Sequence, residues 1–303
     1  MLAIAVTSSS GTTAVYPSDD EGASFAAATL TVPGSLNGIE VSSVTPGEVF
    51  AVGNGATDAG VGTPFIVSSS DRGQSWSQSL MHPELTGQLL RLAQLDRVAA
   101  DTLYLRVSYP TYDELWVSRD GGKTMQKLFT AAEPLSAFLA SADGSLYAGT
   151  RNGGLYEAPA SAPAAFVLVN GSVHPRCLAE RGGQLYACGD DFKDGFALGS
   201  SSDHGRTFSD VVRFDQIAGL ASCPSEPAFA QTCAFAWQTI SELFRGADAG
   251  STTGAKSSSC GGCASGLVGP EGTDLFLPGL LLLWLRKRRT QPPRRGIRSI
   301  STG

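Results

Sequence analysis

Charged residues and helix-forming runs are scarce in this sequence. Asp, Glu, Lys and Arg make up 17% of its 303 residues, whereas glycine alone occurs 36 times and proline 16 times. Glycine and proline destabilise helix interiors, and stretches of Ala, Glu, Lys and Leu that would favour helices are few. The composition therefore argues against a helical bundle. Because 42% of the residues are hydrophobic, the chain still has enough apolar side chains for the core of one large or two medium domains.

Basic residues are also scarce in the body of the chain. Residues 1–250 contain 14 Lys and Arg against 26 Asp and Glu, and seven further basic residues lie within the last eighteen positions. An acidic body repels the phosphate backbone of DNA or RNA. The sequence therefore predicts no nucleic-acid partner.

Potential metal ligands lack the spacing that a metal site needs. Cys260 and Cys263 form a Cys-x-x-Cys pair, but structural zinc requires a second ligand pair, and the three histidines, His82, His174 and His204, are scattered. A thioredoxin-like redox site would need a βαβ context, which this sequence does not provide. We predict neither a metal nor a cofactor.

One motif recurs four times, with the pattern Ser-x-Asp-x-Gly-x-Ser/Thr followed by an aromatic residue, or by Met in one copy. The matching residues are Ser18, Asp20, Gly22, Ser24 and Phe25; Ser69, Asp71, Gly73, Ser75 and Trp76; Ser118, Asp120, Gly122 and Thr124, followed by Met125; and Ser201, Asp203, Gly205, Thr207 and Phe208. Hydroxyl and carboxylate oxygens at this spacing bind nearby backbone N–H groups, and the glycine supplies a positive φ. Each copy therefore predicts a hairpin turn.

The copies start 51, 49 and 83 residues apart, and the last gap equals two periods of about 42 residues, so a worn copy is expected near residue 158. Apolar strand-like segments precede the turns, as at residues 63–67 and 114–117, and further segments precede those, as at 49–52, 102–105, 145–148 and 184–187. Each period therefore holds about four short strands. Four strands per repeat of 40 to 50 residues indicate an all-β fold of β-propeller blades.

The four motifs resemble the Asp-box, or bacterial neuraminidase, repeat of sialidases, sortilin-type receptor propellers and photosystem assembly factors. The resemblance covers residues 1–245 and implies a propeller in which the motif Asp residues are structural, at outer turns between the third and fourth strands. Five blades are visible. The first has chain for only three strands, and residues 217–222 are a candidate for its innermost strand. The alternative is a propeller of six or seven blades whose beginning is missing.

The first four cysteines predict disulfides. Gly182 and Gly183 form a two-residue hairpin turn that places Cys177 opposite Cys188, within bonding reach. Cys223 and Cys233 would close a short loop. Free buried thiols are the alternative for both pairs. Disulfides imply an oxidising compartment, yet residues 1–6 lack an export signal, so we expect an exported protein whose natural start lies upstream.

The C-terminal residues divide into three segments. Residues 246–259 are a flexible linker rich in Gly, Ser and Thr. Residues 260–289 combine the Cys-x-x-Cys pair, an apolar run at 275–285 and a basic cluster at 286–289; as a helix that run spans about 16 Å, short of a bilayer core. Residues 290–303 are expected to be a disordered basic tail.

Residues 258–289 resemble the C-terminal sorting segments of myxobacterial surface proteins. The resemblance implies membrane contact before processing, a processing role for Cys260 or Cys263, and display on the outer surface. The basic cluster would stay cytoplasmic. The chain departs from that pattern in its fourteen residues after the cluster.

No catalytic residues are predicted. A sialidase-like site needs three converging arginines, a Tyr–Glu pair and an acidic Asp, and the chain has no arginine-containing segment of the expected kind before its first motif. The remaining acids are interpreted as solvated loop charges; they are Glu40, Asp101, Asp113, Glu114, Asp190, Asp191 and Asp194.

The resulting hypothesis is an exported, monomeric, non-catalytic propeller that binds an unknown protein or glycan. Two loops between second and third strands, residues 54–62 and 189–194, are candidate binding loops, although they can equally be simple connections. Calcium at Asp190 and Asp191 is a further alternative. A glycoside hydrolase with an incomplete catalytic set is the second hypothesis.

Overall fold

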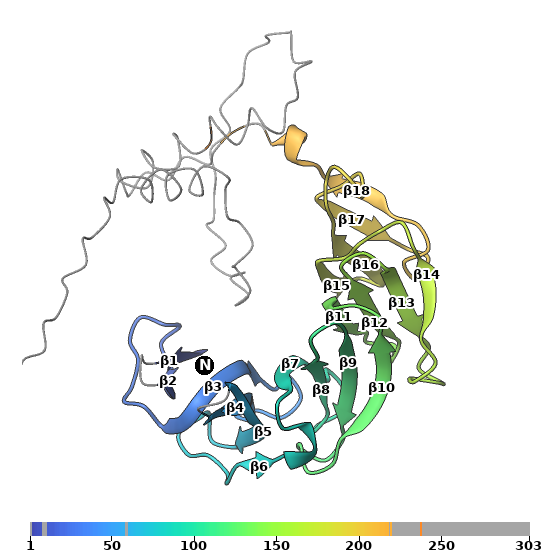
Figure 1. Ribbon diagram of the computed structural model, residues 1–303. Helices are drawn as coiled ribbons and strands as arrows, with labels where there is room; N and C mark the ends of the chain where they lie inside the picture. The colour runs from blue at the N-terminus through green and yellow to red at the C-terminus, as the bar shows by residue number, and fades with distance from the viewer. Residues whose placement is uncertain (1, 8–10, 58–59, 218, 220–236, 238–303) are drawn as a thin grey trace, which may run out of the picture. The chain divides into compact units, whose positions relative to one another are not determined.

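The computed structural model describes residues 2–7, 11–57, 60–217, 219 and 237 (Figure 1). Within these residues the chain is almost entirely β-structure, with two 3₁₀ turns, η1 (Pro83–Leu85) and η2 (Phe214–Gln216). The strands are β1 (Leu2–Thr7), β2 (Thr12–Ser18), β3 (Leu30–Val41), β4 (Val49–Thr57), β5 (Gly60–Ser69), β6 (Leu80–Met81), β7 (Leu89–Leu95), β8 (Leu103–Ser108), β9 (Asp113–Ser118), β10 (Gln126–Ala131), β11 (Leu135–Ala140), β12 (Leu146–Thr150), β13 (Gly154–Ala158), β14 (Val167–Asn170), β15 (Cys177–Arg181), β16 (Gln184–Cys188), β17 (Leu198–Ser201) and β18 (Ser209–Val212).

The strands pair with their chain neighbours in antiparallel meanders. Three sheets have four strands each, β7–β10, β11–β14 and β15–β18, which we name blades 3, 4 and 5. A fourth sheet runs from β1 to β6. The predicted strands at 49–52, 63–67, 102–105, 114–117, 145–148 and 184–187 all fall within these strands or one residue outside them.

The six-stranded sheet consists of two blades that share the long strand β3. Residues 30–33 of β3 pair with β2, whereas residues 34–41 pair with β4. The change occurs at Gly34, which has φ +125°, and a Cβ there would lie 2.1 Å from the Asn54 carbonyl oxygen. Only glycine fits this crossing. We name β1, β2 and residues 30–33 blade 1, and residues 34–41 with β4, β5 and β6 blade 2.

The hydrophobic core lies between neighbouring blades. One buried cluster joins Phe50 and Ile66 of blade 2 to Leu90 and Leu105 of blade 3. Equivalent clusters join blades 3 and 4, and blades 4 and 5. Blades 3 and 4 thus bury both faces, which explains why their middle strands are nearly continuous apolar runs.

The first strands of successive blades lie beside one another. Contacts join the pairs β3 and β7, β7 and β11, and β11 and β15. The Leu95 backbone N–H of β7 donates to Glu40 Oε2 of β3 (2.9 Å), and the Ala140 N–H of β11 donates to Gln94 Oε1 of β7 (2.9 Å). The same side-chain bridge therefore recurs at two junctions.

Four-stranded antiparallel meanders, packed face to face with their first strands adjacent, define a β-propeller. The all-β fold class and its propeller architecture are confirmed. Blade 1 contributes three strands to the part of the chain that the structure describes. Most of the candidate closing segment, residues 218 and 220–222, lies outside it, as do the linker, the sorting segment and the basic tail. Among the residues placed here, no helix has the length and hydrophobicity needed to cross a bilayer.

Candidate functional site

The four motif turns share one hydrogen-bond pattern, which Asp120 illustrates. Ser118 Oγ donates to Asp120 Oδ1 (2.8 Å), the Gly122 N–H donates to Ser118 Oγ (2.8 Å), and Thr124 donates its N–H to Oδ1 (2.9 Å) and its hydroxyl to Oδ2 (2.7 Å). The same bonds occur around Asp20, Asp71 and Asp203.

These bonds determine the ionisation of the motif carboxylates. The hydroxyl and the N–H of the following Ser or Thr lower the pKa of Asp20, Asp71, Asp120 and Asp203 to about 2. A carboxylate bonded in this way stays ionised and serves as an acceptor within the turn.

The backbone of each turn explains the motif glycine. The residue before it already has a positive φ in all four copies, as in Arg72 (61°) and His204 (62°), and the glycine continues in the left-handed region. A Cβ on Gly205 would lie 2.4 Å from Leu155 Cδ2 of the preceding blade, and one on Gly122 would lie 2.9 Å from Ile66 Cδ1. The turns of blades 2, 3 and 5 join the third strand of the blade to the fourth, and those of blades 3 and 5 pack against the blade before them.

The first predicted binding loop, residues 54–62, consists of strand residues wherever the structure describes it, which excludes residues 58 and 59. Strand β4 continues to Thr57 and β5 starts at Gly60, with Ala56 paired to Val61. Asn54 is 3% exposed. Its Nδ2 donates to the carbonyl oxygens of Gly62 (3.1 Å) and Gln88 (2.8 Å), and its Oδ1 accepts from the Leu90 N–H (3.0 Å). Residues 54–57 and 60–62 therefore extend the β4–β5 hairpin, and a binding role for this connection stays a prediction.

The second predicted loop, residues 189–194, does connect β16 to β17, and we name it the blade 5 loop. Asp194 has a fully buried side chain. Its Oδ1 lies 2.7 Å from His174 Nδ1, and its Oδ2 accepts from the Asp190 N–H (2.6 Å). Asp191 Oδ2 accepts from the Phe214 N–H (3.3 Å). The carboxylates therefore point inward and hold the loop.

Phe192, at the tip of this loop, is 72% exposed. The sequence alone predicts no role for Phe192. The one feature of the sequence that could have indicated it is an aromatic residue between Asp and Lys residues. The calcium alternative receives no support from the described residues, in which no group of three or more His, Cys, Asp or Glu side chains could hold a metal ion.

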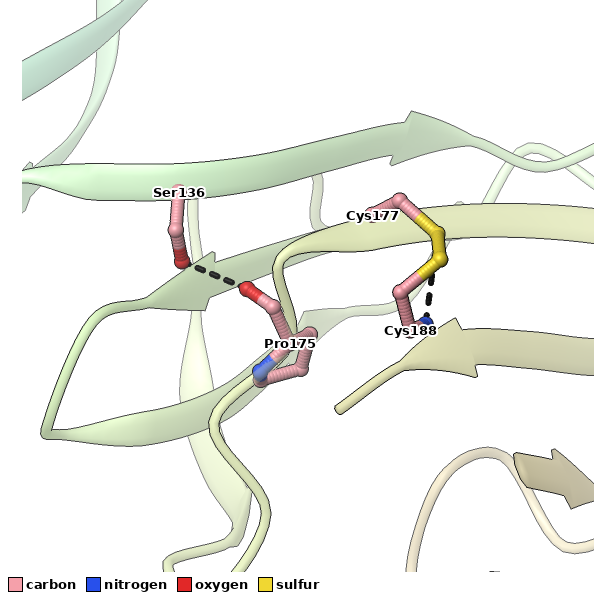
Figure 2. The surroundings of a disulfide bond; sticks show 4 residues. All are labelled: Ser136, Pro175, Cys177 and Cys188. Atoms are coloured by element: carbon pink, nitrogen blue, oxygen red, sulfur yellow. Dashed lines mark hydrogen bonds between the residues drawn. A yellow bond between two sulfur atoms is a disulfide. The ribbon is translucent and has the colours of Figure 1, made fainter. Parts of the chain in front are cut away.

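A disulfide lies at the base of the blade 5 loop (Figure 2). Cys177 and Cys188 are register partners on β15 and β16, with Cα atoms 4.9 Å apart, as the Gly182–Gly183 turn predicted. The Cys188 N–H also donates to Cys177 Sγ (3.2 Å), and Ser136 Oγ of blade 4 donates to the Pro175 carbonyl oxygen just before β15. The predicted disulfide between Cys177 and Cys188 is confirmed. Cys223, Cys233, Cys260 and Cys263 lie outside the described residues.

Several acids interpreted as solvated loop charges are buried and bonded, so that interpretation is wrong for Asp113, Glu114, Asp191 and Asp194. Asp113 is 1% exposed; its Oδ2 pairs with Arg106 Nε (2.8 Å) and accepts from the Leu135 N–H of the next blade (2.7 Å). These carboxylates hold strands and loops together. Their burial and their bonds in the structure reveal this role.

Glu114 is the most heavily bonded of these acids. Its oxygens accept from Lys127 Nζ (2.9 Å), Trp116 Nε1 (2.9 Å) and Tyr109 Oη (3.1 Å). Burial would raise the pKa of Glu114, but the hydrogen bonds, led by that from Lys127, outweigh burial and lower it. An acid held ionised in this way is poorly suited to general acid catalysis.

Comparisons with known proteins add the following. No protein-family model matches this chain, and no curated protein matches it. Among solved structures, a chain of the nidogen–laminin complex shares 14% identity over 68% of this chain and 76% of its own, with a TM-score of 0.47. A chain of YCF48 bound to D1 peptide shares 16% identity over 68% and 63%, with a TM-score of 0.45. Penicillium chrysogenum α-L-arabinanase complexed with arabinobiose shares 12% identity over 68% and 69%, with a TM-score of 0.40.

Proposed function

We propose that this protein is an exported, surface-displayed, non-catalytic propeller that binds a protein or glycan partner through the blade 5 loop. The observation that carries the proposal is the side chain of Phe192, which is 72% exposed in a loop whose Asp191 and Asp194 are buried and bonded. Solvent-exposed aromatic side chains on rigid supports are frequent centres of binding energy.

The loop is held at both of its ends. The Cys177–Cys188 disulfide ends one residue before it, and Asp194 with His174 closes it at the other end. A loop already held in one conformation loses little conformational entropy on binding. Burying an aromatic ring such as that of Phe192 would contribute about 1.5–3 kcal/mol.

Export and display rest on chemistry outside the loop. A disulfide at Cys177 and Cys188 requires an oxidising compartment to persist. The resemblance of residues 258–289 to a sorting segment supports surface display, with the Asp-box resemblance of the four motif turns supporting a scaffold of this class. We infer that the propeller acts as a monomer and that the C-terminal segment contacts the membrane before processing.

The test of the binding proposal is a loop variant on the full chain. Phe192→Ala should weaken binding of the purified protein to the intact surface of its own cells, and to any glycan retained on an immobilised panel, by about tenfold to a hundredfold. Val98→Ala is the matched control, because Val98 is 69% exposed at a distant turn of blade 3. Equal binding by both variants would refute the role of the loop.

Two further measurements separate this proposal from its alternatives. Turnover of fluorogenic glycosides by the full-length protein would favour the glycoside hydrolase hypothesis. Mass spectrometry of the protein from surface and membrane fractions should find a mature end near Cys260, and an unprocessed chain with reduced cysteines in the cytoplasm would refute export and display.

A further inference from the structure

A polar pocket of about 250 Å³ lies between blades 4 and 5. Its walls come from the turns that join first to second strands in both blades and from the fourth motif turn. These turns lie at one end of the blade, whereas the blade 5 loop joins second to third strands and so lies at the other. The pocket is therefore independent of the loop proposed above.

Tyr147 and His204 form the inner wall of this pocket. Tyr147 Oη lies 2.9 Å from His204 Nδ1 and donates to Glu157 Oε1 (3.3 Å), and His204 Nδ1 also lies 3.1 Å from Glu157 Oε1. Burial, with the charge of Glu157 as the next cause, raises the pKa of Tyr147 well above its usual value. The phenol therefore remains neutral.

At the equivalent position between blades 2 and 3, Phe50 and Gly121 take the places of the tyrosine and the histidine, and a Cβ on Gly121 would also lie 3.5 Å from Asp101 Oδ1. Phe50 is the second residue of β4 as Tyr147 is of β12, and Gly121 occupies the motif position of His204. A Cβ on Gly121 would lie 3.9 Å from the Phe50 ring. The repeat thus folds with Phe and Gly at this junction, so neither the tyrosine nor the histidine is needed for the turn. His204 even keeps the left-handed φ of 62° that suits Gly121 better.

Two carboxylates complete the pocket. Glu180 Oε2 accepts from Ser141 Oγ (2.7 Å) and from the Ala142 N–H (2.9 Å), which fixes the side chain of Glu180. Its Oε1 makes no hydrogen bond within the described part of the chain. Asp143 accepts from the Ser145 N–H (2.8 Å). No Lys or Arg lines the pocket.

We propose that this junction pocket binds the guanidinium group of an arginine side chain on a peptide partner. Carboxylates are acceptor-only groups and a guanidinium is donor-only, with a planar fork that suits paired acceptors. Asp143, Glu180 and the Tyr147 hydroxyl oxygen supply acceptors around a space large enough for one side chain. The negative charge of residues 1–250 would attract a basic partner.

The three histidines make binding directly observable. Imidazole NMR signals of the full-length protein should be followed during titration with an acetyl-Gly-Arg-Gly-amide peptide, with His204 assigned by its loss in His204→Gly. We expect signals of His204 alone to shift, and we expect a dissociation constant of about 1 mM for the arginine peptide. The matching peptide with citrulline, whose urea is neutral, should give no shift.

Variants test which groups hold the ligand. Glu180→Gln keeps an acceptor for Ala142 but removes the charge, and should weaken the arginine peptide about tenfold. Asp210→Asn removes an exposed charge on β18 and should leave binding unchanged. Unshifted signals of His174, beside Asp194, report that blade 5 remains folded in each variant. Any of three results would overturn the proposal. They are equal binding of the citrulline peptide, no shift of the His204 signals at a peptide concentration about 20 times the expected dissociation constant, and full affinity in Glu180→Gln.

Discussion

The connections between second and third strands in blades 2 and 5 both contain Gly and Asp but have different structures. Residues 54–62 contain three Gly and one Asp, and residues 189–194 contain one Gly and three Asp. Residues 54–57 and 60–62 continue β4 and β5 as a hairpin, whereas residues 189–194 leave the sheet. In blade 2 the polar side chain Asn54 is buried and binds backbone groups. In blade 5 the acids are held inward, and the aromatic Phe192 faces solvent.

The difference shows what decides whether such a connection stays in the sheet or leaves it. The partner that each polar side chain finds decides this, and not the type of side chain. Asn54 finds the Leu90 N–H on the first strand of blade 3, which makes it part of the blade junction. Asp194 finds the Asp190 N–H within its own loop and His174 in the segment just before β15, while Phe192 is 72% exposed.

Substitution of Asn54 in blade 2 should have the largest effect on stability. Asn54→Ala leaves buried backbone groups without partners, and we expect it to lower the free energy of unfolding by about 2–4 kcal/mol. Asn152→Ala is the control, because Asn152 is exposed and its Nδ2 bonds Glu133 near the surface (3.0 Å). Urea denaturation measures both, and a loss below that of the control would contradict the structural role.

Removal of the disulfide in blade 5 should have a somewhat smaller effect on stability. The double variant Cys177→Ser and Cys188→Ser releases a short loop of the unfolded chain, and should cost about 2–3 kcal/mol. Because the disulfide ends beside the blade 5 loop, the variant should also weaken partner binding, as measured on the same surfaces as Phe192→Ala. Unchanged stability would indicate that the bond is not formed in the native protein.

Acid should weaken both blades alike, because their motif turns are alike. The pKa of Asp71 and Asp203 is about 2 in the folded protein, below the usual 3.8. The folded state therefore binds fewer protons than the unfolded state, and the contribution of these turns is present above about pH 4 and lost as pH falls toward about 2.

Urea midpoints measured between pH 2 and pH 6 should show this loss. Asp71→Asn and Asp203→Asn should each be less stable at pH 6 and show a smaller drop on acidification, by similar amounts. A drop unaffected by either variant would place the acid-sensitive groups elsewhere.

Much of the fold follows from local patterns in the sequence. The motif predicts a turn because a serine hydroxyl and an aspartate at that spacing reach the following backbone N–H groups, and the Cys177–Cys188 pairing follows from counting outward from Gly182–Gly183. The candidate site was less accessible. Asp113 and Asp194 resemble surface acids in sequence, and only their partners in the structure, Arg106 and His174, show that they are bonded.

The sequence by itself determined the repeat, the strand order, the turn chemistry and one disulfide, because these depend on contacts between residues close in the chain. The tertiary structure decided which acids are buried, that Asn54 belongs to a junction, that Phe192 projects, and that Tyr147 meets His204. Each of these depends on how one blade packs against the next or on how a loop folds back on its blade. Such contacts join residues whose separation in sequence carries no local signal.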